Sequence, residues 1–192
     1  MDLPGIVIKL REGDEQAFRE LFNQYRDRVF NTALGLLQQH ENAEDTTQEV
    51  FIEIHRSVAN FRGECGLSTW IYRITVSKSL ELIRSGRRKK RYATVLSLFG
   101  YEDRLHLAAE APFYHPGVRL ENKERAAILF KAIEKLPLNQ RTAFILHKVE
   151  GLSHPEIAAI LSTTVSAVES LMVRARKNLR NLLSDYYEKN EK

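Results

Sequence analysis

Hydrophobic side chains recur every three or four residues along most of this chain, which is the spacing of amphipathic α-helices. In the first half the spacing predicts helices over about residues 14–39, 41–58 and 68–91. In the second half it predicts helices over about residues 119–136, 139–150, 153–161 and 166–187. No stretch convincingly shows the alternation of a half-buried strand, so the pattern indicates an all-helical fold.

Between the two groups of helices, residues 92–118 lose the helical period and contain two glycines and two prolines. A connection of this length without regular structure is unusual inside one compact domain. We therefore predict an all-α fold of two small helical domains, residues 1–91 and 119–192, joined by a flexible linker over residues 92–118.

A helix-turn-helix pattern lies near the end of the second domain. Ser153 followed by Glu156 predicts a capped helix start, and Ser166 followed by Glu169 predicts another. The second helix has an apolar stripe at Val168, Met172, Ala175, Leu179 and Leu182. Its other side is polar and basic, which is typical of a recognition helix that packs on one face and meets the DNA major groove with the other.

Charge is unevenly distributed, and this tells more than the net charge of +4. Residues 1–83 hold nine Lys and Arg against thirteen Asp and Glu, whereas residues 84–91 hold six basic and no acidic side chains. Residues 123–192 hold twelve basic and eight acidic side chains. The segregation suggests two different partners, one that prefers acidic side chains and one that is a polyanion.

Other features restrict the class of function. The single cysteine, Cys65, excludes an internal disulfide and favours a reducing compartment. No apolar run approaches the ~20 residues of a membrane span, and the start lacks a secretory signal, so we expect a cytoplasmic protein without membrane insertion. The six histidines are dispersed and no phosphate-binding loop or nucleophile–base arrangement stands out. We expect no metal, no cofactor, no small-molecule substrate and no enzymatic activity.

Three segments carry a resemblance to a known family. They are residues 45–52 (DTTQEVFI), residues 61–64 (FRGE) with 68–74 (STWIYRI), and the stretch from 136–141 (LPLNQR) through Arg176. In this order the chain resembles a bacterial extracytoplasmic-function (ECF) sigma factor of the sigma-70 family, with regions two and four only. The resemblance implies a transcription initiation factor that binds core RNA polymerase, recognises the minus-ten and minus-thirty-five promoter elements and promotes DNA melting.

The resemblance also assigns roles to residues. It implies core-polymerase binding by Asp45, Gln48, Glu49, Phe51 and Glu53. It implies minus-ten DNA binding by Asn60, Phe61, Arg62, Trp70, Arg73, Ser77, Arg84, Arg87 and Arg88. For minus-thirty-five DNA the candidates are Ser166, Glu169, Ser170, Val173, Arg174, Arg176 and Lys177. An anti-sigma factor is implied as a further partner.

The residue types suit these roles. Aromatic and basic side chains near residues 60–73 can capture unstacked bases, and the basic cluster at 84–91 can neutralise phosphates. On the recognition helix, Arg174 can bond guanine, Glu169 can accept from a cytosine amino group and Val173 can meet a thymine methyl. Ser77, Glu169 and Leu171 depart from the residues usual in the family, which affects the promoter sequence rather than the class.

Two other functions remain compatible with the pattern. A conventional helix-turn-helix repressor or activator would bind duplex DNA alone, whereas a sigma factor needs core polymerase for specific promoter affinity. A helical adaptor that binds only protein would use its acidic and basic faces merely as solvated surfaces. A gel shift with and without core polymerase separates the first of these from a sigma factor, and the absence of nucleic-acid binding would favour the second.

Overall fold

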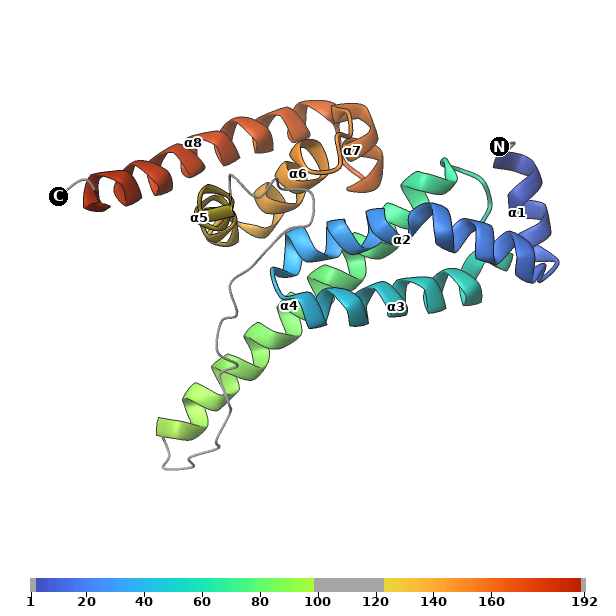
Figure 1. The fold of residues 1–192 in the computed structure, drawn as a ribbon, viewed down its shortest axis with the longest axis horizontal. Coiled ribbons are helices and arrows are strands. Elements are labelled where there is room, and N and C mark those ends of the chain that lie inside the picture. Colours follow the sequence, from blue (N-terminus) through green and yellow to red (C-terminus); the bar gives the residue numbers. More distant parts are fainter. Residues whose placement is uncertain (1–2, 99–122, 191–192) are drawn as a thin grey trace.

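The computed structural model describes the backbone of residues 3–98 and 123–190, with most of their side chains. Within these residues all regular secondary structure is helical, as predicted, and the helices form two domains (Figure 1). The first domain contains α1 (Leu3–Arg11), α2 (Glu15–Leu37), α3 (His40–Ser57), the short 3-10 helix η1 (Val58–Asn60) and α4 (Leu67–Leu98). The second contains α5 (Lys123–Glu134), α6 (Leu138–Lys148), α7 (His154–Ile160) and α8 (Val165–Asn190).

The first domain is built on α2, α3 and the first half of α4, which lie side by side (Figure 1). The Asp14 carboxylate caps α2 by accepting from the backbone N–H groups of Gln16 and Ala17 at 2.8 and 3.1 Å, as the sequence predicted. Gln38 adopts a left-handed conformation (φ 58°) that ends α2 and turns the chain into α3. The buried core includes Leu21, Val29, Val50, Ile54 and Ile71.

Several predicted boundaries differ from the structure. Helix α1 was not predicted; it packs against α2 and η1 and buries Ile6 and Leu10. Helix α4 begins at Leu67, within two residues of the predicted start, and continues to Leu98, beyond the predicted end at residue 91. The rest of the predicted linker lies outside the described residues.

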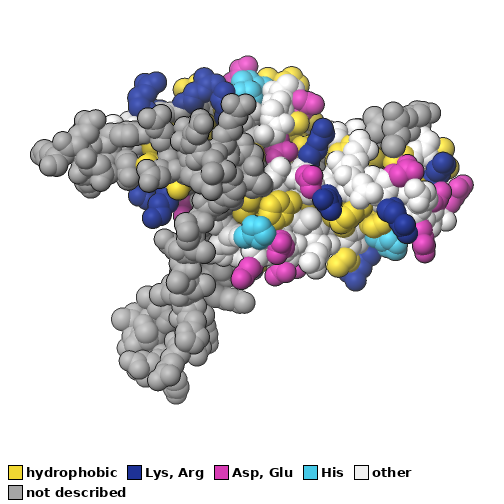
Figure 2. Space-filling view, viewed as in Figure 1, with side chains coloured by type: hydrophobic (Ala, Val, Ile, Leu, Met, Phe, Trp, Pro, Cys, Tyr) yellow, Lys and Arg dark blue, Asp and Glu magenta, His cyan; other side chains and the backbone are white. Residues whose placement is uncertain are grey.

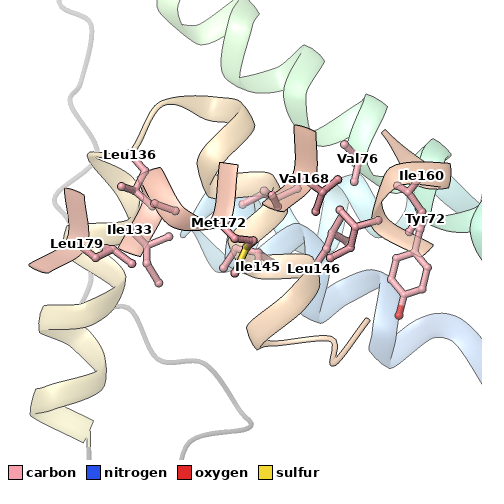
Figure 3. Close-up of a cluster of buried hydrophobic side chains, with 14 of the residues drawn as sticks. Tyr72, Val76, Ile133, Leu136, Ile145, Leu146, Ile160, Val168, Met172 and Leu179 are labelled. Atoms are coloured by element: carbon pink, nitrogen blue, oxygen red, sulfur yellow. The ribbon is translucent and has the colours of Figure 1, made fainter. Parts of the chain in front are cut away.

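The core of the second domain also takes in part of the first. Apolar side chains from α5, α6, α7 and α8 meet Leu36 of α2 and Tyr72 and Val76 of α4 in one buried cluster (Figure 3). Its fully buried members include Ile133, Leu136, Ile145, Leu146, Val168 and Met172. The two domains therefore share a hydrophobic core in this conformation.

Close backbone packing and hydrogen bonds accompany this shared core. A Cβ atom at Gly35 of α2 would lie 2.9 Å from the Ile145 side chain of α6, so only glycine permits the approach without a shift. The buried Arg141 guanidinium donates to the carbonyl of Leu36 at 2.7 Å. The Gln38 side chain donates to the carbonyl of Phe130 at 2.8 Å. These bonds satisfy polar groups that docking removes from water.

Across the described ranges 3–98 and 123–190, no single helix is long and apolar enough to span a membrane. Helices α7 and α8 meet that criterion only when taken together, by length and composition, across a bend of 104°.

Candidate polymerase and nucleic-acid interfaces

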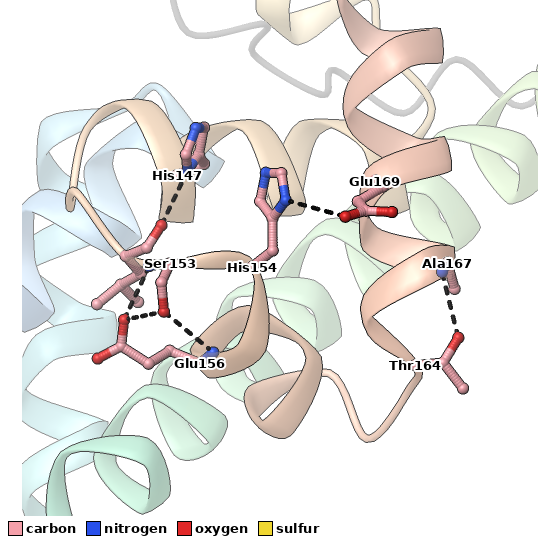
Figure 4. A network of polar contacts seen from close by, with 8 residues as sticks. His147, Ser153, His154, Glu156, Thr164, Ala167 and Glu169 are labelled. Atoms are coloured by element: carbon pink, nitrogen blue, oxygen red, sulfur yellow. Dashed lines mark hydrogen bonds and ion pairs between the residues drawn. The ribbon is translucent and has the colours of Figure 1, made fainter.

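The helix-turn-helix consists of α7, a short turn and the first half of α8. Ser153 caps α7, and the predicted capping box is present: the Ser153 N–H donates to the Glu156 carboxylate at 2.8 Å and the Glu156 N–H to the Ser153 hydroxyl at 3.5 Å (Figure 4). Hydrogen bonds from the Ser153 side chain and backbone lower the pKa of the Glu156 carboxyl. This carboxylate is therefore charged where the helix dipole favours it.

The second helix of the motif begins one residue earlier than predicted. The sequence predicted a capping box at Ser166, but α8 starts at Val165, and Thr164 caps it by accepting from the Ala167 N–H at 3.2 Å. The prediction was wrong because serine and threonine at both positions suit a cap. Ser166 instead lies in the first exposed turn of the helix. The bend of 104° between α7 and α8 falls in the range of helix-turn-helix motifs.

Helix α8 has one buried and one exposed face, as the sequence predicted. Val168, Met172, Ala175 and Leu179 are at most 5% exposed and pack into the shared core. The candidate minus-thirty-five residues lie elsewhere on the helix, exposed except for the half-buried Ser170: Ser166, Glu169, Ser170, Val173, Arg174, Arg176 and Lys177. Val173 is 65% exposed, so its methyl groups are accessible to a ligand. Basic side chains are visible over the described part of α8 in Figure 2.

Helix α3 presents the acidic face predicted to bind polymerase. Asp45, Gln48 and Glu49 are exposed on the same side of the helix because they are spaced by three or four residues. Two other candidate polymerase-binding residues are less accessible to a partner. Phe51 is buried in the first-domain core, and Glu53 forms an ion pair with Lys78 of α4, with 3.8 Å between the Nζ and Oε2 atoms.

Two exposed apolar residues near this surface, Ile52 and Phe22, were not predicted from the sequence as part of it. Ile52 follows Glu49 by three residues on α3 and is 50% exposed. Phe22 of α2 is also exposed, and its ring lies 4.7 Å from that of Phe51, between ring centroids. Ile52 could have been recognised from the sequence, because it is an apolar residue that interrupts the acidic face. Phe22 could not be recognised, because its spacing fits the buried side of α2 equally well.

The loop after η1 brings together some of the candidate minus-ten residues. The Phe61 ring packs on Trp70 with 4.9 Å between centroids, and Phe61 is only 7% exposed. The Arg11 guanidinium of α1 donates to the Phe61 carbonyl and so connects α1 to the loop. Asn60 and Arg62 are exposed on either side of Phe61. Phe61 therefore supports the loop, while its neighbours are available to a ligand.

Arg73, another minus-ten candidate, contacts the second domain. Its Nε and Nη2 atoms donate to the carbonyl of Ala159 in α7 at 3.0 and 2.6 Å. The hydroxyl of the adjacent Tyr72 donates to the Glu150 carboxylate at 3.0 Å. Burial raises the pKa of Glu150, and burial together with the Glu150 carboxylate raises the pKa of Tyr72, so the phenol keeps its proton. In this conformation Arg73 can bind DNA only after it leaves α7.

The remaining candidates lie farther along α4. Ser77, Arg84 and Arg88 are exposed, on the helix whose second half projects away from the other helices (Figure 1). The side chain of Arg87 lies outside the described residues. The structure thus brings the loop residues and Trp70 together, joins Arg73 to the other domain, and spaces the basic side chains along a single helix.

Comparison with known proteins places both domains in one family. Residues 21–89 match Sigma-70 region 2, and residues 126–179 match Sigma-70, region 4. The chain is 32% identical over 182 residues to the ECF RNA polymerase sigma-E factor of Haemophilus influenzae, covering 92% of this chain and 93% of that protein. It is 30% identical over 189 residues to the RNA polymerase sigma-H factor of Pseudomonas aeruginosa, covering 93% of this chain and 92% of that protein.

The fold also matches a solved structure, that of the sigma factor RpoE from Bartonella quintana in complex with the anti-sigma factor NepR. The TM-score is 0.65 at 22% sequence identity, and the match covers 87% of this chain and 96% of that chain. At this identity the similarity establishes the fold.

Proposed function

The chain belongs to the sigma-70 family as an ECF sigma factor, and we propose that it binds core RNA polymerase and directs it to promoters by recognising the minus-ten and minus-thirty-five elements and promoting DNA melting. The observation that carries this proposal is the exposed, largely polar and basic face of α8, opposite a fully buried stripe in a capped helix-turn-helix. A DNA-reading helix requires this combination of packing and exposure.

A sigma factor differs from a DNA-binding regulator that acts alone, because it needs core polymerase to bind promoters specifically. An electrophoretic shift assay with duplex promoter DNA should show a specific complex only when core polymerase is present. A specific complex formed by the chain without core polymerase would contradict the proposal and favour a conventional repressor or activator.

We assign polymerase binding to α3. Asp45, Gln48 and Glu49 offer carboxylate and amide groups, and Ile52 beside them offers apolar contact area. An interface with a desolvated apolar centre and charged groups around it is typical of specific protein–protein binding. The face fits a partner surface that is basic and helical. Glu53 contributes less directly, because Lys78 already neutralises part of its charge.

We assign strand capture to the loop around Phe61. Replacing Asn60 and Arg62 together with alanine should reduce promoter opening about five- to tenfold, since exposed amide and guanidinium groups there are available to unstacked bases. Phe61 itself should be kept, because its removal would leave a cavity against Trp70. Permanganate reactivity of thymines in the melted region measures the opening.

The control for this loop variant is a pull-down of core polymerase, which should be unchanged. Arg26→Ala, at an exposed position on α2, provides a matched loss of one basic side chain. Normal permanganate reactivity in the double variant would contradict the assignment of the loop.

We assign minus-thirty-five recognition to the exposed face of α8. Replacing Arg174 with alanine should lower transcription from promoters that depend on that element about five- to a hundredfold, since loss of a base contact costs ~1–3 kcal/mol. Arg180→Ala removes an exposed arginine from the same helix and should weaken all promoters evenly. Equal losses for the two variants, across promoters with different elements, would show that Arg174 reads no base.

We also propose that an anti-sigma factor regulates this chain. The RpoE structure with the same fold contains the anti-sigma factor NepR, and both domains of this chain correspond to that fold. Affinity purification of the tagged chain from cells in which it is inactive should recover such a protein in place of core polymerase.

A further inference from the structure

Glu169 is an acidic side chain on the exposed face of α8. Its neighbours along the same helix include Arg174, Arg176 and Lys177, so it is a carboxylate in a basic surface. Phosphates repel a carboxylate at a DNA interface unless another group offsets its charge. A carboxylate that serves as an acceptor for a cytosine amino group also has to point at the base edge.

One side chain from the other helix of the motif lies close enough to act on Glu169. His154, at the start of α7, has its Nδ1 atom 3.9 Å from Glu169 Oε1 (Figure 4). The His154 side chain is 28% exposed and that of Glu169 is 58% exposed, so the contact lies at the edge of the surface. This distance is longer than a hydrogen bond, so the ring acts on the carboxylate by electrostatic attraction through an N–H dipole.

The surroundings of His154 determine which of its nitrogens can donate. Its Nε2 atom is buried without a hydrogen-bond partner among the described residues, whereas Nδ1 faces Glu169. A neutral ring with its proton on Nδ1 places its one N–H beside the Glu169 carboxylate, whereas the other tautomer would place a lone pair there and bury an unpaired N–H. The arrangement therefore favours an Nδ1–H group directed toward Glu169.

The His154 ring also packs against a residue of α6. It packs on the His147 ring of α6 with 4.9 Å between centroids. His147 Nδ1 lies 2.8 Å from the carbonyl of Leu152, and since a carbonyl only accepts, His147 donates there and is fixed in turn. His154 thus connects the rigid core side of the motif to a side chain on its DNA-facing surface (Figure 4).

We propose that His154 is a positioning residue for promoter recognition, whose Nδ1–H dipole attracts the Glu169 carboxylate and so favours the orientation in which it accepts from a cytosine amino group. This inference rests on the proposed function of α8. It predicts that His154 influences which base is preferred at one position of the minus-thirty-five element, without contacting DNA itself.

The test is transcription by core polymerase with the full chain on a template library randomised in the minus-thirty-five element. The wild-type chain should enrich cytosine at one position, and Glu169→Ala should lose this preference about five- to tenfold. His154→Phe keeps a ring against His147 but lacks the donor, and should reduce the same preference about threefold. His154→Gln keeps a donor and should retain most of it.

A combined variant separates positioning from a general structural effect. His154→Phe added to Glu169→Ala should change the base preference no further, because the group on which His154 acts is gone. Circular dichroism on heating checks that each variant is folded. An unchanged cytosine preference in His154→Phe, an additive loss in the combined variant, or equal losses in the Phe and Gln variants would each overturn the proposal.

The wild-type result distinguishes this inference from the function on which it rests. If the wild-type chain drives no transcription that depends on the minus-thirty-five element, the proposed function fails. If it does so and Glu169→Ala leaves the cytosine preference intact, the function stands and only the role of Glu169 and His154 is rejected.

Discussion

Replacing Glu49 with lysine should weaken binding to core polymerase about thirtyfold or more and should lower transcription from every promoter to the same extent. Glu49 is exposed in the middle of the acidic face of α3, next to the half-exposed Ile52. Reversing a charge at an interface with a basic partner removes an attraction and places like charges opposite one another, which costs several kcal/mol. Gln48→Ala should have a smaller effect in the same direction.

Titration of labelled polymerase with the purified variants measures this effect. Glu12→Lys, at an exposed position between α1 and α2, is the matched charge reversal outside α3 and should bind normally. Thermal unfolding should be unchanged in both variants, since neither side chain is buried. Equal polymerase affinity of Glu49→Lys and the wild-type chain would remove α3 from the interface.

Replacing Leu146 with alanine should reduce the free energy of unfolding by about 2–5 kcal/mol. Leu146 is fully buried on α6, in the cluster that joins α8 to Tyr72 and Val76 of the first domain (Figure 3). The cavity left by the lost atoms adds to the lost hydrophobic transfer energy. Because this cluster supports α8 as well as the contact between domains, both should loosen together.

Urea denaturation followed by circular dichroism measures the loss of stability. Leu82→Ala on α4, where the side chain is 38% exposed, is the matched control and should change stability by less than about 0.5 kcal/mol. A similar, small change for both leucines would mean that the shared core does not contribute as its burial implies.

The sequence predicted the elements that local patterns determine. The apolar stripe of α8 and the Ser153 capping box were predicted correctly, because periodic hydrophobicity and caps depend on residues within one or two turns. Helix α1 was missed because it spans only nine residues, contains Gly5, which is a weak helix former, and is stabilised by packing against α2 and η1.

Contacts between distant segments could not be predicted in the same way. Periodicity showed that one side of α4 is apolar, but not that Tyr72 and Val76 pack against the second domain. Arg73, a candidate for DNA binding, donates to the Ala159 carbonyl of α7 in this conformation. Phe61, a candidate for binding unstacked bases, is buried against Trp70 in the same conformation. Residue type indicates which ligands a side chain can bind, whereas the tertiary fold determines which residues of the protein it contacts.

The matches to both sigma regions place the chain in the sigma-70 family. Run-off transcription with purified core polymerase on a genomic library tests whether the chain directs polymerase to promoters. We expect start sites that share two upstream elements and that appear only when the chain and core polymerase are both present. Transcripts that are absent, or that start at the same sites without the chain, would contradict the proposed function.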